Sequence, residues 1–359
     1  MPAKILSTKL FIPPPRTDLV SRPRLLDHLR QGSTRKLTLI SAPAGYGKTT
    51  LLSEWIDLQE MPFGWLSLDQ GDNDPDRFLA YLIASLSSIP IEVDDEIANR
   101  LGNSQEDPAE ERLIPLINQI SMTEGHFALV LDDYYLIHDA QVHELVTYLL
   151  DNLPPQMHLL VATRTDPPLR LSQLRAQGEL CEIRAEELRF TDQETIHFLN
   201  QSMNLGLTSE DVQTLSQKTE GWIAGLQLAA ISLQGHQDKQ AFVSAFAGDD
   251  RYIADYLLDE ALKRQPTYIQ NFLLQTSILD RLCAPLCNTI TGREDSQAIL
   301  IELEIANLFL IPLDNQRNWF RYHQLFADLL KNRFHQLQAE ALPDYHKKAS
   351  SWYQENDLY

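Results

Sequence analysis

The sequence is poor in cysteine, in long apolar runs and in positive charge. Its three cysteines, Cys181, Cys283 and Cys287, are too few for a disulfide framework, so we expect buried thiols. No stretch approaches the ~20 apolar residues of a membrane helix, and the N-terminus lacks the apolar run of a signal peptide. Lys and Arg total 30 against 50 Asp and Glu, a net charge of −20. These absences predict a reduced, cytoplasmic chain that contacts neither membrane nor DNA directly.

Apolar runs alternate with amphipathic helical patterns in the first half of the chain. This rhythm is typical of βαβ units and predicts a doubly wound α/β domain with a parallel five-stranded sheet. A helix is expected to start near Ser21, as its cap, and to stop before Gly32. The polar segment 89–112 is expected to be an exposed insertion. The predicted strands cover residues 36–41, 63–68, 127–133, 158–164 and 180–188.

Helical patterns replace strands from about residue 190. Thr191 and Glu194 form a capping-box pattern, and further helices are expected at 209–218, 221–234 and 251–263. A helix, a short hairpin and another helix then follow, which is the outline of a winged helix. Glu302 and Glu304 lie in its candidate recognition helix, which argues against DNA reading. The expected domains are a P-loop domain (1–187), a helical domain (188–250), a winged helix (251–342) and the start of a further helical arm or sensor (343–359).

The stretch SAPAGYGKTT follows the first strand and opens a helix, as a phosphate-binding loop does. Ala42 stands where that motif has its first Gly, which is acceptable if φ there is negative. Lys48 would reach the β- and γ-phosphates, and the Thr49 hydroxyl would bind Mg²⁺. A chance Gly-Lys-Thr at a strand-to-helix turn is the alternative. The predicted nucleotide-binding residues of the loop are Ala44, Gly45, Tyr46, Gly47, Lys48, Thr49 and Thr50.

The segment FALVLDDYYLI supplies a second motif, an apolar strand that ends in two aspartates. Asp132 would hold Mg²⁺ through water, and Asp133 would orient or activate the attacking water. Two acidic residues at the start of a loop would be the alternative, but the pairing with the phosphate loop favours the catalytic interpretation.

The run Thr163-Arg164-Thr165-Asp166 permits two interpretations. It is similar to the guanine-reading motif of GTPases, but that motif carries Lys in place of Arg164, and GTPases need Asp-x-x-Gly after the second motif strand. Asp132 is followed by no such Gly, so we expect adenine. In the ASCE division of P-loop proteins, which this motif order resembles, Arg164 would end a strand between the two motif strands and sense the γ-phosphate. An Arg that only caps a strand is the alternative.

These motifs together resemble the STAND ATPases, and more closely the large ATP-binding LuxR-type transcriptional regulators. The resemblance covers nearly the whole chain through SAPAGYGKTTL, GWLSLDQGDNDPDRFLAYL, LVLDDYYLI, LRFTDQE, GWIAGLQLAA, FLLQTSIL and LFLIPLD…WFRYHQLF. It implies nucleotide-binding, helical and winged-helix domains, with a repeat sensor and a DNA-binding domain beyond residue 359.

The resemblance also implies two contacts to the nucleotide. Val20 and Arg22 match a short motif that packs the adenine, and His323 matches a winged-helix histidine that touches the ADP β-phosphate. A strand-end His bonded to backbone is the alternative for His323. Gly225 matches a glycine beside the adenine, but the Pro that usually follows two residues later is missing.

The expected function is a signalling switch with slow ATP hydrolysis, using ATP or ADP and Mg²⁺. The resemblance implies that ADP holds a closed resting state, and that ATP with a small-molecule or protein inducer permits self-association. The alternative is a P-loop ATPase or GTPase enzyme with direct catalytic output, such as a kinase or a motor. No Arg-dense lid and no finger Arg stand out, which favours the switch.

Overall fold

The computed structural model describes residues 5–15, 19–87, 89, 109–234, 238–248 and 250–356, without the side chains of 109–111. The chain divides into two compact units. The first comprises Met1–Ala42 and Gly47–Leu188, and the second comprises Pro43–Tyr46 and Arg189–Tyr359. The expected insertion at 89–112 lies almost entirely outside the described residues.

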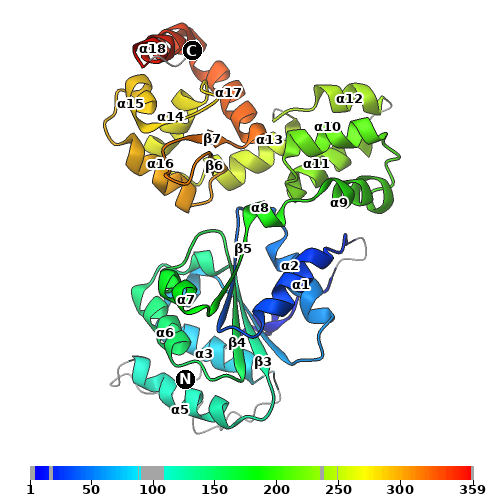
Figure 1. Ribbon diagram of the computed structural model, residues 1–359, viewed down its shortest axis with the longest axis vertical. Helices are drawn as coiled ribbons and strands as arrows, with labels where there is room; N and C mark the ends of the chain where they lie inside the picture. The colour runs from blue at the N-terminus through cyan, green and yellow to red at the C-terminus, as the bar shows by residue number, and fades with distance from the viewer. Residues whose placement is uncertain are drawn as a thin grey trace. The chain divides into compact units, whose positions relative to one another are not determined.

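The first unit is built on a five-stranded parallel sheet, as predicted (Figure 1). The strand order is β2-β3-β4-β1-β5, so β4 lies between the two motif strands, β1 and β3. Ser41 pairs with Thr163, and Ser67 pairs with Asp132, so the carboxyl ends of these strands meet at one edge of the sheet. The strands are β1 (Leu37–Ser41), β2 (Phe63–Ser67), β3 (Phe127–Asp132), β4 (Met157–Thr163) and β5 (Leu180–Arg184).

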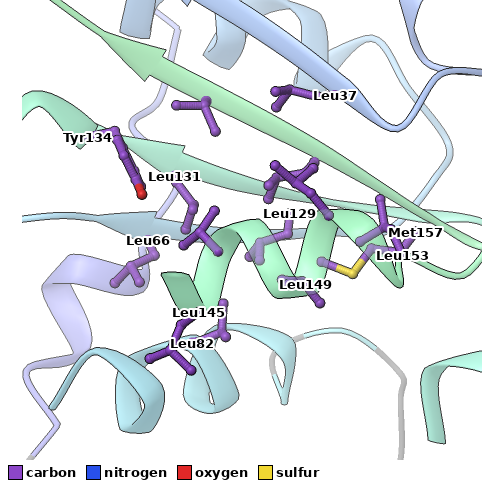
Figure 2. Packing of buried hydrophobic residues seen from close by; sticks show 14 of the residues in the cluster. Leu37, Leu66, Leu82, Leu129, Leu131, Tyr134, Leu145, Leu149, Leu153 and Met157 are labelled. Carbon is purple, nitrogen blue, oxygen red and sulfur yellow. The ribbon is translucent and has the colours of Figure 1, made fainter. Parts of the chain in front are cut away.

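Helices cover both faces of this sheet, with α1 and α2 on one side and α6 and α7 on the other (Figure 1). One face packs into a continuous apolar core with the helices α3, α5 and α6 (Figure 2), where Leu129 and Leu131 of β3 lie near Leu145 and Leu149 of α6. The helices are α1 (Pro23–Gly32), α2 (Lys48–Asp57), α3 (Pro75–Leu86), α5 (Ala109–Met122), α6 (Ala140–Asp151), α7 (Leu171–Gln177) and α8 (Ala185–Leu188).

Three details of the first unit differ from the sequence prediction. The first helix includes Gly32, whereas the sequence predicts a stop before that residue. The first helix begins at Pro23, and Ser21 is not its cap: Arg22 stands at the cap position without a side-chain capping bond. Proline with its fixed φ is favoured at the first helical position, which explains the start. The predicted last strand ends at Arg184, and the rest of that segment forms α8.

The second unit begins with a helical segment, as expected. The capping box is present, because Thr191 accepts from the backbone of Glu194, and Glu194 accepts from the backbone of Thr191. A π-helical turn, His197–Ser202, then extends α9. The helices are α9 (Asp192–Ile196), α10 (Ser209–Thr219), α11 (Ile223–Gln234), α12 (Lys239–Ala245) and α13 (Arg251–Leu257), which a second π-helical turn (Leu258–Leu262) extends.

A winged helix follows, with its two-stranded hairpin between α16 and α17. Strands β6 (Leu310–Pro312) and β7 (Phe320–Tyr322) pair antiparallel, and Phe320 also bridges to Leu282. Its helices, with the one that follows, are α14 (Thr267–Thr276), α15 (Ala284–Thr291), α16 (Ser296–Ile305), α17 (Gln324–Gln338) and α18 (Leu342–Glu355). Across the described part of the chain, every helix is too short or too polar to span a bilayer.

Candidate functional site

The phosphate loop connects β1 to α2 and contains two glycines in the left-handed region. Gly45 has φ 79° and Gly47 has φ 73°, values that L side chains rarely adopt. Ala42 is fully buried, has no positive φ, and donates its backbone N–H to Thr163 O at 3.3 Å. Alanine therefore fits at the position where the motif usually has its first glycine.

Lys48 is buried at the start of α2, where its ammonium donates to Ala42 O at 2.7 Å. Burial, with Arg164 nearby, lowers the pKa of Lys48 to about 8, and Asp133 and Asp132 oppose that shift only in part. A cation held in this way regains favourable interactions when an anion such as phosphate binds.

Thr49 contacts the end of β3. Its Oγ1 donates to the Asp132 carboxylate, at 2.9 Å from Oδ2 and 3.2 Å from Oδ1. Burial, reinforced by Asp133, raises the pKa of Asp132 to about 6. Within the described residues no three His, Cys, Asp or Glu side chains are grouped to hold a metal. A hydroxyl beside one carboxylate is instead the donor set that Mg²⁺ shares with water and phosphate oxygens.

Asp133 and Arg164 lie at the ends of β3 and β4. Asp133 adopts φ 57°, left-handed and uncommon outside glycine, and donates its N–H to Asp132 Oδ1 at 3.0 Å. The Arg164 guanidinium lies over the Tyr135 ring, 4.4 Å from its centroid. The register of the parallel strands places both residues at the same edge of the sheet as Lys48. Ligands bind at this edge in open α/β sheets.

Arg22 also contacts the loop. It is 2% exposed, and its guanidinium donates to Gly47 O at 3.3 Å and to Leu188 O at 3.4 Å. Val20 is buried beside it in sequence, and Thr50 is half-buried on α2. The adenine contact predicted for Val20 and Arg22 stays a prediction, as does the nucleotide contact of Thr50.

The loop residues Pro43–Tyr46 belong by their contacts to the second unit. Trp222 Nε1 donates to Ala44 O at 3.1 Å, and Ala224 N donates to Gly45 O at 3.0 Å. Burial raises the pKa of Tyr46 to about 12, although the neighbouring Arg189 opposes the shift. The remaining loop, from Gly47 onward, belongs to the first unit.

His323 follows β7 in the second unit and is 1% exposed. Its Nε2 donates to Thr219 O at 2.9 Å, while its Nδ1 has no hydrogen-bond partner among the described residues. Burial lowers the pKa of His323 to about 4, so the imidazole is neutral near pH 7. Nδ1 is then an acceptor, so binding a phosphate oxygen there would require a proton. The predicted β-phosphate contact stays a prediction.

The sequence analysis included GWIAGLQLAA only as part of the resemblance. It did not predict that Trp222 of this segment is buried and donates to Ala44 O. Gly225 is the residue that makes room for it, since a Cβ there would lie 2.5 Å from the Trp222 ring. The sequence analysis also gave no role to two charged residues of the second unit, Glu220 and Arg189. A Gly-Trp pair directly after an amphipathic helix was the available signal for a tight turn that buries a large side chain.

A known protein family and several known proteins match this sequence. The family described as "MalT winged helix domain" matches residues 258–342. The HTH-type transcriptional regulator MalT of Vibrio cholerae is 34% identical over 338 residues, 93% of this chain and 37% of that protein. The serine/threonine-protein kinase PknK of Mycobacterium tuberculosis is 33% identical over 345 residues, 95% of this chain and 31% of that protein. The chain thus spans about a third of the length of these relatives.

One solved structure shares the fold across almost the whole chain. It is a STAND protein with a tetratricopeptide repeat sensor from Pyrococcus horikoshii, with a TM-score of 0.50 and 15% identity, covering 99% of this chain and 47% of that one. The parallel sheet, the phosphate loop and the winged helix thus agree with the MalT likeness in sequence. The chain is similar in sequence to MalT over nearly its whole length and shares the fold of a STAND protein, with a P-loop sheet, a helical segment and a winged helix.

Proposed function

We propose that this chain is the ATP- and ADP-binding switch core of an inducer-responsive regulator. The observation that carries the proposal is the contact between Thr49 and Asp132 beside the buried Lys48. Hydroxyl, carboxylate and ammonium are the three groups that a Mg²⁺–nucleotide needs from a phosphate loop. Their placement at the carboxyl edge of a parallel sheet is the usual position of a nucleotide site.

The loop residues suit a polyphosphate. Gly45 and Gly47 are left-handed, a backbone conformation that lets successive N–H groups of a loop bind one anion, and the N-terminus of α2 adds its dipole. Lys48 would bind the β- and γ-phosphate oxygens. Thr49 would bind Mg²⁺ directly and Asp132 through water, and the ion would neutralise phosphate charge.

Two residues would act in hydrolysis. Asp133, held left-handed at the end of β3, would orient or activate the attacking water. Arg164 would stabilise the γ-phosphate, but its guanidinium must first leave the Tyr135 ring. A stabilising cation that is engaged elsewhere supports slow turnover, which suits a switch better than a catalyst.

Two different outputs among the relatives support a switch. One relative is named a transcriptional regulator and another a protein kinase, yet both carry this module. We infer that the module supplies nucleotide-dependent control, and that the output belongs to other parts of those proteins. The domain limits that we propose are 1–187, 188–250, 251–342 and 343–359. ADP would hold the resting state, and ATP with an inducer would permit self-association.

The test is the identity and the origin of the bound nucleotide. The purified 359-residue chain is heated, and the released nucleotides are separated by anion-exchange chromatography. Adenine nucleotide is expected, and a guanine nucleotide would refute the proposed specificity. Light scattering with ATP and with ADP then compares the oligomeric states, and equal states would refute the switch. Rapid steady-state ATP turnover would favour the catalytic alternative.

A further inference from the structure

The turn Thr219–Trp222 joins α10 to α11 in an uncommon backbone conformation. Glu220 has φ 50°, and the next residue, Gly221, has φ 69°. A left-handed glutamate persists only where its surroundings fix it. Gly221 cannot be replaced without movement, because a Cβ there would lie 2.6 Å from Phe190 O. The turn is therefore held in one shape by contacts on both sides.

The winged helix supplies the contacts on one side of the turn. The Glu220 carboxylate accepts two hydrogen bonds of 2.7 Å from the Arg321 guanidinium and one of 2.9 Å from Gln324 N. His323 Nε2 donates to Thr219 O at 2.9 Å. Paired bonds of a guanidinium to a carboxylate fix orientation as well as distance. The position of the turn is therefore fixed by hydrogen bonds to the residues at the end of β7.

The phosphate loop lies against the other side of the turn. Trp222, fully buried, donates from Nε1 to Ala44 O, and Ala224 N donates to Gly45 O. The fit is close, because a Cβ on Gly45 would lie 2.5 Å from Ala224 Cβ and 2.8 Å from Trp222 Nε1. A small displacement of Trp222 would therefore move the loop.

Holding these two carbonyls has a consequence for the adjacent donors. In a planar trans peptide the C=O and the following N–H point in opposite directions. Fixing Ala44 O and Gly45 O toward Trp222 and Ala224 therefore aims the N–H groups of Gly45 and Tyr46 the other way. These N–H groups are among those that a phosphate-binding loop presents to its ligand.

We propose that Glu220 is a positioning residue for the phosphate loop. Its bonds to Arg321 set the Thr219–Trp222 turn, the turn sets Trp222, and Trp222 sets the direction of the loop donors. The position of the end of β7 in the winged helix thereby controls nucleotide release. The control of release rests on the proposed nucleotide function, whereas the mechanical link from Glu220 to Trp222 does not.

The first experiment measures release of a fluorescent ADP analogue by stopped flow. The variants are Glu220→Gln, Arg321→Gln and Trp222→Phe, of which the last keeps an aromatic ring and loses the Nε1 donor. Each is expected to speed release about tenfold, because each removes one or two of the hydrogen bonds that hold the turn or the loop. The double variant Glu220→Gln/Trp222→Phe should release no faster than Trp222→Phe alone, because both changes act through one contact.

Glu182→Gln is the matched control. Glu182 on β5 also accepts paired bonds from a guanidinium, that of Arg175, at 2.8 and 2.9 Å, and its pKa is likewise held at about 2. It should change release less than twofold. Urea unfolding of all variants separates positioning from stability: the inference is overturned if release tracks the free energy of unfolding across Glu220→Gln and Glu182→Gln alike.

A second measurement needs no nucleotide. The chain is labelled with 5-fluorotryptophan, and the ¹⁹F resonance of Trp222 is assigned by its absence in Trp222→Phe. Glu220→Gln and Arg321→Gln should shift this resonance, and Glu182→Gln should leave it unchanged. If Glu220→Gln does not fold, Glu220→Gly keeps the left-handed backbone and removes the same carboxylate. An unshifted resonance overturns the inference, whereas failure of the parent chain to bind any adenine nucleotide overturns the proposed function alone.

Discussion

The two units treat buried charge in opposite ways. In the first unit, burial outweighs the available partners at the phosphate loop, so the pKa of Lys48 falls to about 8 and that of Asp132 rises to about 6. In the second unit, Glu220 is half-buried, and although this partial burial favours the neutral form, the bonds from Arg321 hold its pKa at about 2. The first pair is arranged for a ligand, whereas the second is a completed structural contact. The pKa shifts of Lys48 and Asp132 thus oppose their charged forms, whereas that of Glu220 favours its charged form.

Lys48→Ala should produce the largest effect. It removes the cation that meets phosphate, so affinity for ADP is expected to fall at least ~100-fold, the equivalent of one lost charge-assisted contact. Isothermal titration measures the loss. Lys36→Ala is the control, because Lys36 precedes β1 and its ammonium donates to Leu150 O and Asp151 O at the sheet's other end. Equal affinity of Lys48→Ala and the parent would refute the loop assignment.

Asp72→Asn should be the most destabilising change to the fold. Asp72 is fully buried and paired with Lys9, and it accepts from Arg77 Nε at 3.2 Å. Removing the charge leaves buried Lys9 short of a partner and should cost about 3 kcal/mol of unfolding free energy. Asp27→Asn, at an exposed pair, is the control. Nucleotide affinity should be unchanged, since Asp72 is paired with Lys9 and Arg77 and not with residues of the phosphate loop. A change in affinity would break the comparison.

Asp132→Asn should stabilise the folded state at pH 7, in contrast to Asp72→Asn. A carboxyl whose pKa is raised from 3.8 to about 6 favours the folded state at low pH, and that contribution is lost as pH rises from about 4 to 6. At pH 7 without Mg²⁺ the charge on Asp132 therefore destabilises the folded state. The amide should add about 1 to 3 kcal/mol of unfolding free energy. The same variant should bind Mg²⁺–ATP more weakly. A loss of stability at pH 7 in EDTA would contradict the interpretation.

Nucleotide binding should weaken as pH rises through about 8. In the free protein Lys48 loses its proton near that pH, whereas phosphate holds the proton on in the complex. Affinity is therefore expected to fall by up to about tenfold per pH unit above 8. Binding titrations from pH 6.5 to 9.5 at constant ionic strength measure how the affinity changes with pH. An affinity that stays flat across this range would show that Lys48 remains charged in the free protein.

The sequence predicted the features that depend on short stretches. Apolar runs located all five strands to within a few residues, and the spacing of Gly45, Gly47 and Lys48 located the loop. The resemblance added the strand order, with β4 between the motif strands. Pro23 was a better marker of the first helix than Ser21, because it fixes φ at the first helical position.

The Thr219–Trp222 turn could not be predicted in the same way. The bond from Trp222 to Ala44 spans 178 residues, and that from Glu220 to Arg321 spans 101. No local pattern encodes such a pairing. Glu220 in the left-handed region even contradicts local preference, because glutamate rarely adopts it. The conformation exists only because tertiary contacts impose it.

The smallest effect is expected at an exposed pair, which completes the comparison. Lys263 lies 2.7 Å from Asp259 one helical turn earlier, and both side chains are about two-thirds exposed, at 67% and 65%. Lys263→Ala should change unfolding free energy by less than about 0.5 kcal/mol, because water already solvates both charges. Urea unfolding at low and at physiological salt measures it. A loss as large as that of Asp72→Asn would mean that proximity, and not burial, decides what a charge contributes in this protein.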